Sequence, residues 1–532
     1  MTEQSGTSDV KRLIRHGSVL SLLTLVSRVM GLLREMTKAS LLGTSALSDA
    51  FSVAFMIPNL FRRLFAEGSV AAAFIPTFRE YLLEDNREKT REFLSCFLTF
   101  LTFTVTLAVM AGIIAAPFLV KIFSLEEFEE TVFLTRVMFP FLALISIAAF
   151  FQGILNSLKI FTPSGLAPIL LNITAIACAY GLKGYTKNPA RAMAAGILIG
   201  GFLEAAIQFP FIIRVILKKK TPAFFFTGLK RAFLNEGTKR VLLLIGPTIL
   251  GMAAYQLNDL VSTALAGYAG AGVVSSLQYS LRMQELILGI FAVSIGTVLL
   301  PDLAELAKSH NWEIFTQRLL SAMNIIAVIT IPITFFFLAR GESLIRLLFQ
   351  SNSFNDDSVR LTLEAFTFHM PGLYFIALNR ILAPAFYAQS NSKSPTFAGI
   401  ISIAVNITLA WVLAPRFRGA GIAFALSFAS MINTVFLLIF MKKNNRIAMG
   451  AILKPAVFYS IKLMFFSAIA VIPVWLLGSR LEAFFAGRGR FIGLGIPLAI
   501  MVLLFAFTGI TLLAVTGDKQ LKNIIILLKK KP

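Results

Sequence analysis

The sequence predicts an all-α protein that crosses a membrane many times, with about fourteen transmembrane helices. Two observations lead to this fold class. Hydrophobic residues make up 57% of the 532 residues and charged residues only 14%, whereas a soluble globular protein carries about 25% charged residues. At about 20 residues per membrane-spanning helix, the length accommodates roughly a dozen or more spans. Because the apolar stretches leave no room for a sizeable soluble domain, a water-soluble enzyme is excluded.

Apolar runs, bounded by Gly, Pro and charged residues, define each expected span in order along the chain. The first two spans and the eighth contain the most polar residues. The expected spans cover residues 17–42, 48–80, 90–118, 131–157, 162–182, 191–216, 239–268, 272–306, 314–339, 358–388, 394–414, 419–441, 452–478 and 490–515.

The distribution of Lys and Arg predicts that both termini lie on the cytoplasmic side. About 28 of the 49 basic residues fall in the connections on the side of the N-terminus and about 13 on the opposite side, as the positive-inside rule requires. This alternation explains most of the net charge of +22, so the basic excess does not indicate a nucleic-acid-binding protein. Cys96 and Cys178 both lie in apolar runs and predict no disulfide framework.

An internal repeat relates spans 1–6 to spans 7–12. Residues 140–162 resemble residues 371–396, and the motif Asn-Ile-Thr follows at 172–174 and again at 406–408. Chance similarity among Leu-, Ile- and Ala-rich helices is the alternative. Parallel repeats of this kind place a substrate site between two lobes that rock against each other.

The repeat predicts two pseudo-symmetric six-helix lobes, a linker between them and two further helices. Residues 222–236 of the linker combine aromatic side chains with Lys230 and Arg231, which favours an interfacial helix lying on the membrane surface. The predicted domains are an N-lobe over residues 1–220, an amphipathic cytoplasmic linker over 221–238, a C-lobe over 239–445, and the last two spans with a basic amphipathic tail over 446–532.

Charged residues inside the apolar spans mark the candidate site, since each costs at least about 2.5–3.5 kcal/mol at the bilayer centre. On spans 1, 2, 7 and 8 the polar residues recur every three or four positions and so share one helical face. Such faces are expected to line a hydrated cavity instead of pointing at lipid. The candidate substrate-binding residues are Arg28, Arg34, Asp49, Asn59, Arg62, Arg63, Glu67, Ser275, Arg282, Glu285 and Arg380.

Arginines dominate this set, and their guanidinium groups bind phosphate oxygens through two parallel hydrogen bonds. The expected cargo is therefore anionic and phosphorylated. The alternative is a set of internal ion pairs, because Arg63 and Glu67 are four residues apart and Arg282 and Glu285 three apart. A purely structural bundle would gain little from so many buried ions. The sequence contains no glycine-rich phosphate loop, and we expect a transporter and not an enzyme.

Two motifs resemble signatures of the MviN/MurJ-type lipid II flippases. Residues 27–35 read SRVMGLLRE and residues 49–68 read DAFSVAFMIPNLFRRLFAEG, and residues 282–289 and 382–387 (LAPAFY) also match. The resemblance covers essentially the whole chain and implies membership of the multidrug/oligosaccharidyl-lipid/polysaccharide exporter superfamily. It implies a multi-pass protein of the bacterial cytoplasmic (inner) membrane. The implied activity moves lipid II, the undecaprenyl-diphosphate-linked peptidoglycan precursor, from the inner to the outer leaflet by alternating access.

The resemblance also implies roles for single residues. Met56 stands where the family usually has Lys or Arg, so one phosphate contact is expected to be missing or displaced. Asp259 would take part in a sodium site. No cofactor is implied, whereas Na⁺ or proton coupling and the membrane potential are candidate driving forces. The implied partners are lipid II, membrane lipids and the cell-wall synthesis machinery. The family's essential arginines and supporting acids fall on Arg28, Arg34, Arg62, Arg282, Asp49 and Glu67.

Three other functions stay open from the residues alone. The first is a flippase for another polyprenyl-diphosphate-linked glycan, because arginines recognise phosphate and not the sugar. A drug or cation antiporter of the same superfamily should instead have a site dominated by carboxylates. The third is a membrane scaffold without transport, which should tolerate Arg28→Ala or Arg282→Ala.

Overall fold

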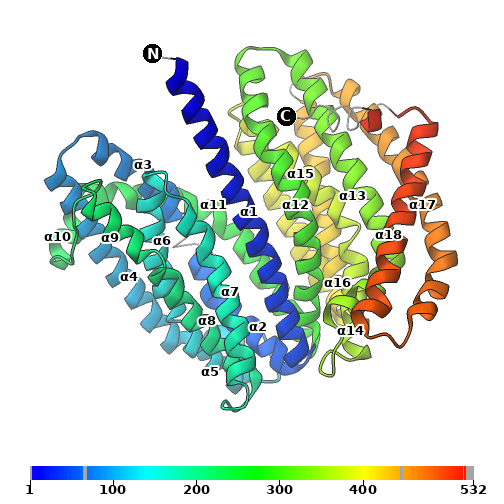
Figure 1. The fold of residues 1–532 in the computed structure, drawn as a ribbon, viewed down its shortest axis with the longest axis horizontal. Helices are drawn as coiled ribbons and strands as arrows, with labels where there is room; N and C mark the ends of the chain where they lie inside the picture. Colours follow the sequence, from blue (N-terminus) through cyan, green and yellow to red (C-terminus); the bar gives the residue numbers. More distant parts are fainter. Residues whose placement is uncertain (1–2, 64–68, 444–446, 519, 523–532) are drawn as a thin grey trace. The chain divides into compact units, whose positions relative to one another are not determined.

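The computed structural model describes residues 3–63, 69–443, 447–518 and 520–522, with side chains described outside 3–22, 69–72, 247–255 and 290–298. Over these residues the regular structure is helical, without a strand, as the predicted all-α class requires. The chain divides into two compact units, Met1–Ser275 and Ser276–Pro532, which are treated one at a time below. Figure 1 shows the helices of both units. The predicted domain boundaries stay a prediction.

The first unit is built around an apolar cluster from α2, α5, α6, α7 and α8. Phe51, Met138, Phe141 and Met193 are among its buried members. The helices of this unit are α1 (Glu3–Leu42), α2 (Ala46–Arg62), α3 (Ser69–Leu83), α4 (Arg87–Lys121), α5 (Phe128–Met138), α6 (Phe141–Ser157), α7 (Thr162–Leu182), α8 (Pro189–Ala206), α9 (Phe209–Leu217), α10 (Leu229–Leu234), α11 (Glu236–Tyr268) and the start of α12 (Val273–Lys308).

The second unit has an apolar cluster of its own, with Leu303, Phe315, Ile381 and Ile452 among the buried members. Its helices α17 and α18 pack on each other and on α13. The helices of this unit are the rest of α12, α13 (Trp312–Phe349), α14 (Asp356–His369), α15 (Gly372–Tyr387), α16 (Lys393–Lys442), α17 (Met449–Phe485), the short π-helix η2 (Phe491–Gly495) and α18 (Ile496–Val515).

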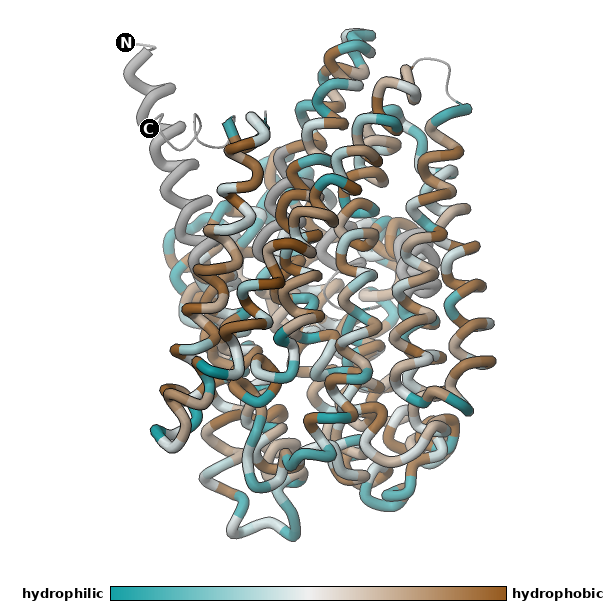
Figure 2. Tube along the Cα trace, turned by 90° about the vertical axis from the view of Figure 1, so that its right-hand side faces the viewer, coloured by the Kyte–Doolittle hydropathy of each residue, from teal (hydrophilic) through white to brown (hydrophobic). Residues whose placement is uncertain are grey.

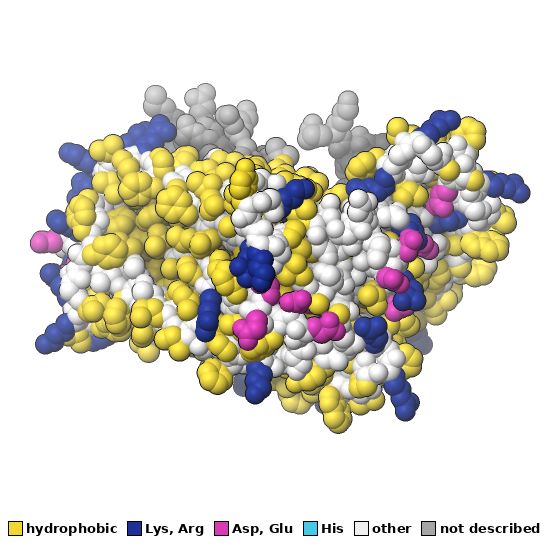
Figure 3. Space-filling view, turned by 90° about the horizontal axis from the view of Figure 1, so that it is seen from below, with side chains coloured by type: hydrophobic (Ala, Val, Ile, Leu, Met, Phe, Trp, Pro, Cys, Tyr) yellow, Lys and Arg dark blue, Asp and Glu magenta, His cyan; other side chains and the backbone are white. Residues whose placement is uncertain are grey.

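Eight described helices are long and apolar enough to cross a membrane, or nine if the bent pair α14 and α15 forms one span. The test covers the described residues only, and the remaining expected spans, over α1, α2 with α3, α11 and α12, each contain residues outside that set. The predicted count of fourteen is compatible with this result. Apolar residues predominate along the helices and polar ones gather at their ends and in the loops (Figure 2). Charged side chains of both signs lie on the face seen from below (Figure 3).

Helix α16 contains two of the expected spans. Its 50 residues would reach about 75 Å as one helix, far more than the roughly 30 Å of a hydrocarbon core. The chain reverses at Arg418, whose φ of 47° lies in the left-handed region. A Cβ at Gly421 would come within 2.8 Å of the Leu413 carbonyl oxygen, so glycine permits the tight pairing of the two spans.

Breaks at equivalent places in the two units agree with the internal repeat. Pro140 is the N-cap of α6 after the short α5, and Pro371 is the N-cap of α15 after α14. The axes of α14 and α15 are bent by 46°. Each proline lacks an N–H and so ends the preceding hydrogen-bond ladder.

The second expected span, over residues 48–80, corresponds to α2 and α3, and residues 64–68, with Glu67 among them, lie outside the described residues. One expectation about local structure needs revision. The interfacial segment over 222–236 was expected to be helical. Residues 222–228 are instead extended, and only Leu229–Leu234 form a helix before α11.

Candidate functional site

The polar face of α1 ends in a chain of ion pairs that reaches α2. The Arg34 guanidinium lies 3.0 Å from the Glu35 carboxylate, and the Lys38 ammonium lies 3.3 Å from its other oxygen. Lys38 is buried and also donates to the Ser52 hydroxyl at 3.1 Å. The guanidinium of Arg34 stands 5.4 Å from the centre of the Phe55 ring. The predicted site residue Arg34 is therefore held between α1 and α2.

Asp49, on the first turn of α2, binds the beginning of α12. One carboxylate oxygen accepts hydrogen bonds from the Ser275 amide at 2.8 Å and the Ser275 hydroxyl at 2.6 Å. The other oxygen accepts from the Gly272 amide at 2.7 Å. The carboxylate is buried, and it meets amides at a helix N-terminus, where negative charge is favoured. The predicted residues Asp49 and Ser275 thus come together, but they are hydrogen-bonded to each other.

A small cavity of about 220 Å³ opens beside this contact. It lies between the start of α2, the turn at 124–126 and the turn at 267–271, and Asp49, Glu126 and Tyr268 are among its lining residues. Water in such a cavity would reach the buried carboxylate. Hydrogen bonds to Asp49 therefore hold this end of the first unit together beside the cavity.

The end of α2 presents two further arginines. Arg62 donates from Nε to the Asn59 side-chain oxygen at 2.6 Å. The Arg63 guanidinium lies 4.0 Å from the Asp259 carboxylate on α11, and these two side chains are 38% and 44% exposed. Arg28, on α1, is half-buried and makes no hydrogen bond or ion pair with any residue described by the structure. Asn59 and Asp259 therefore each orient one of these two arginines.

In the second unit, Arg282 lies 3.4 Å from Glu285, one turn further along α12, as the ion-pair alternative expects. Their side chains are 31% and 55% exposed. Arg380 is exposed on α15. The side-chain amide of the neighbouring Asn379 donates to the Ser430 carbonyl oxygen at 3.0 Å.

The other ion pair of that alternative joins Arg63 to Glu67. Glu67 lies outside the described residues, so this pair stays a prediction. Convergence of the arginines of both units stays a prediction.

Asp259, the residue expected in a sodium site, lies on α11. Its carboxylate is 4.0 Å from the Arg63 guanidinium. A sodium ion at Asp259, and coupling of transport to Na⁺ or protons, remain predictions.

The sequence interpretation missed Gly272. The residue has a φ of +80°, and a Cβ there would lie 2.2 Å from the Thr44 carbonyl oxygen, so only glycine brings its amide to Asp49. The signal was present as the run Gly-Ala-Gly at 270–272 directly before a polar span. Glycines placed before a helix supply free amides for an anion.

A family model described as "Lipid II flippase MurJ" matches residues 38–495, most of the chain. The chain belongs to the lipid II flippase MurJ family. One MurJ relative, the "Probable lipid II flippase MurJ" of Treponema pallidum, is 45% identical over 513 residues, which cover 95% of this chain and 96% of the relative. The "Lipid II flippase MurJ" of Burkholderia cenocepacia is 31% identical and covers 79% of this chain and 82% of its own. The predicted family is confirmed.

Solved structures support the MurJ fold. A structure titled "Lipid II flippase MurJ, inward closed conformation" aligns with a TM-score of 0.76 at 24% identity, covering 94% of this chain and 99% of that one. An inward-facing multidrug resistance MATE family transporter of the MOP superfamily aligns with a TM-score of 0.62 at 15% identity, covering 81% and 99%. Both likenesses concern the fold alone.

Proposed function

We propose that this chain moves lipid II from the inner to the outer leaflet of the bacterial cytoplasmic membrane. Membership of the MurJ family over residues 38–495 is the observation that carries this function. The lipid crosses without any covalent change, so the chain acts as a transporter and not as an enzyme. Several half-buried arginines on apolar helices supply the chemistry that a diphosphate needs.

The arginines would hold the diphosphate by exchanging their present acidic partners for it. The pairs of Arg63 with Asp259 and of Arg282 with Glu285 are long and partly exposed. Ion pairs of this kind contribute only about 0–1 kcal/mol, so a diphosphate with several charged oxygens can displace them at small cost. We propose that Arg28, Arg34, Arg62 and Arg380 complete the binding set.

Alternating access would require the Asp49 contact to break. Outward opening separates the start of α2 from the start of α12, and three hydrogen bonds to a carboxylate oppose it. The membrane potential supplies about 2.3 kcal/mol for each negative charge moved outward across 100 mV. Each negative charge of the diphosphate would offset part of the lost contacts. The apolar surfaces of α17 and α18 are exposed and would guide the polyprenyl tail.

An acute depletion experiment tests the function. Cells that depend on this chain are depleted of it, and the fraction of lipid II accessible to a reagent outside the membrane is measured. We expect outer-leaflet lipid II to fall while total lipid II rises. Unchanged accessibility would remove the proposed function.

Arginine variants then test the binding role. Arg28→Ala and Arg282→Ala should each abolish complementation at normal membrane abundance, whereas Arg79→Ala, which removes an exposed arginine of α3, should not. If both site variants complemented, the chain would act as a scaffold. If lipid II stayed accessible while another polyprenyl-diphosphate glycan did not, the substrate would be that glycan.

We further propose that both termini are cytoplasmic and that cell-wall synthesis enzymes are partners. The count of Lys and Arg in alternate connections supports this orientation. Reporters that are active only in the cytoplasm, fused after residue 532 and inserted at 184–187, should be active and inactive respectively. The reverse pattern would overturn the orientation.

A further inference from the structure

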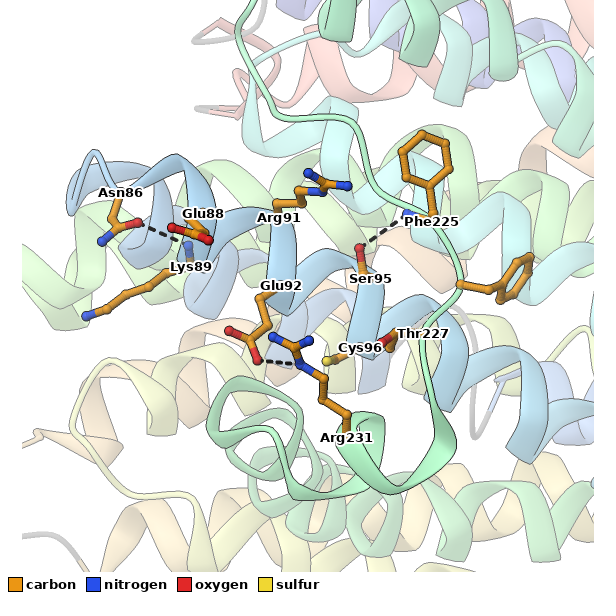
Figure 4. Close-up of a pocket in the computed structure, with 11 residues that line it drawn as sticks. Asn86, Glu88, Lys89, Arg91, Glu92, Ser95, Cys96, Phe225, Thr227 and Arg231 are labelled. Carbon is orange, nitrogen blue, oxygen red and sulfur yellow. Dashed lines mark hydrogen bonds and ion pairs between the residues drawn. The ribbon is translucent and has the colours of Figure 1, made fainter.

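A second cavity, of about 570 Å³, lies away from the arginine set, between the first turns of α4 and the connection from α9 to α11. Figure 4 shows the extended segment of this connection running beside α4. Glu88, Arg91, Ser95, Phe225 and Arg231 are among the lining residues. Its volume falls in the range of about 300–1,000 Å³ typical of small-molecule sites.

The extended segment is fixed to α4 by matched spacing. The Phe225 amide donates to the Ser95 hydroxyl at 3.2 Å, and the Thr227 amide donates to the Thr99 hydroxyl at 2.9 Å. Two residues of extended chain rise about 6.6 Å, and four residues of helix rise about 6 Å. The two α4 hydroxyls therefore meet the amides of alternate residues, which lie on the same edge of the extended segment. Both backbone donors are thereby satisfied at the margin of the membrane.

The far end of the connection is fixed as well. Arg231, on α10, lies 2.9 Å from the Glu92 carboxylate of α4, and the Phe233 ring stands edge-on to Phe100 with centres 5.0 Å apart. The walls of the cavity are thus held by hydrogen bonds, an ion pair and ring packing. The cavity does not depend on a loose loop.

One cation in the cavity, Arg91, has no anionic partner among the residues that the structure describes. Glu92 is paired with Arg231, and Lys89 is paired with Glu84 at 3.7 Å. Arg91 has no ion pair among the described residues, and its guanidinium stands 5.9 Å from the centre of the Phe225 ring. Both Arg91 and the acid Glu88, which lines the same cavity, are exposed.

The surroundings are those of a membrane surface rich in positive charge. Residues 218–240 contain seven Lys or Arg and one acidic residue. Phe225 and Phe226 are 63% and 68% exposed, and further along α4 Leu107 and Met110 are also exposed. Aromatic residues at this level and apolar helix beyond it mark the headgroup layer. The cavity lining itself holds three basic residues, Lys89, Arg91 and Arg231, and two acidic ones, Glu88 and Glu92. A net positive, aromatic cavity at that level attracts anionic lipid.

We propose that this cavity binds the headgroup of an anionic phospholipid. Arg91 binds the phosphate, Phe225 and Phe226 flank the glycerol, and the acyl chains lie along the exposed face of α4. On the proposed orientation this lipid belongs to the cytoplasmic leaflet. Binding would stabilise the connection on α4, and it is independent of lipid II transport.

Native mass spectrometry of the full chain in detergent, titrated with phosphatidylglycerol, tests the proposal. Arg91→Gln should weaken retention of the tightest-bound lipid about tenfold, since a hydrogen bond to a charged group is lost. Arg91→Lys should keep most of the retention. Lys230→Gln is the matched control, because it removes the same charge from an exposed position of α10 outside the cavity, and it should leave retention unchanged.

Three results would overturn the proposal. Equal retention by Arg91→Gln and the unmodified chain would show that the guanidinium takes no part. Equal losses in Arg91→Gln and Lys230→Gln would show general attraction by charge. Displacement of the lipid by an excess of inorganic phosphate would show a site for free anions. Phosphatidylcholine, which has no net charge, should be retained at least several times more weakly than phosphatidylglycerol.

Discussion

Replacing Asp49 by Asn tests the contact between α2 and the start of α12. Asn has nearly the shape of Asp but carries no charge and offers one acceptor oxygen in place of two. If that oxygen keeps the two bonds from Ser275, an NH₂ group faces the Gly272 amide, and two donors then meet at the place of a 2.7 Å hydrogen bond. The Gly272 N–H is left unsatisfied.

The magnitude follows from the number and type of bonds. One hydrogen bond to a charged group is worth about 1.5–3 kcal/mol, and an unsatisfied buried donor costs about 1–3 kcal/mol. Relief from burying the carboxylate offsets part of this loss. We expect a net loss of about 2 kcal/mol for local opening, which is about thirtyfold in the opening equilibrium. Ser275→Ala should cost less, and Asp49→Ala, which removes all three bonds, should cost more.

Hydrogen–deuterium exchange is the direct assay, because the Gly272 and Ser275 amides are themselves the donors. Exchange in a peptide over residues 270–280 should rise about thirtyfold in Asp49→Asn, in line with easier local opening. The control is Asp302→Asn, which removes the same charge from an exposed pair with Arg318 at 3.5 Å, worth about 0–1 kcal/mol. Unchanged exchange in Asp49→Asn, or an equal rise in the control, would refute the reasoning.

Three further substitutions follow from the geometry. Gly272→Ala should lower the melting temperature more than Gly517→Ala, since both glycines have positive φ but only the first faces a backbone oxygen within 3 Å; equal losses would contradict this. Burial raises the pKa of Asp518, but hydrogen bonds from Lys462 and nearby groups outweigh it, so the pKa lies below its ordinary value. Its contribution to stability is therefore present above about pH 4 and lost as the pH falls through the lowered value, and Asp518→Asn should flatten that acid limb in thermal melts. Arg34→Lys should lose most complementation, because an ammonium cannot form the paired bonds of a guanidinium; full activity would argue against bidentate binding.

Much of the fold could be predicted because the bilayer sets the length and polarity of each span. The spans expected over α4, α7, α11 and α13 each coincide with a described helix. The left-handed turn at Arg418 could not be foreseen, since arginine rarely adopts that conformation. The extended stretch at 222–228 was also missed. Its amides are satisfied by hydroxyls about 130 residues away, and no local pattern reveals that.

The helical face on which each candidate site residue lies could be predicted, but its interaction partner could not. Helical spacing placed Arg34 and Asp49 on polar faces. It could not show that Asp49 binds amides more than 220 residues along the chain, because such a pairing depends on how helices pack. Arg63 faces Asp259 on α11, a partner that the spacing along the sequence did not reveal. Side-chain reach lets an arginine choose among several acids, and only the three-dimensional arrangement decides.

The connection between α9 and α11 would be an obvious position at which to divide the chain into two separately produced halves. Its attachment to α4 makes that choice a poor one. A cut before residue 222 would separate the Phe225 and Thr227 amides from the α4 hydroxyls that accept from them, and the Phe233 ring from Phe100. A protease should find few accessible bonds in this stretch, and an N-terminal half intended to survive alone should retain residues through Leu234.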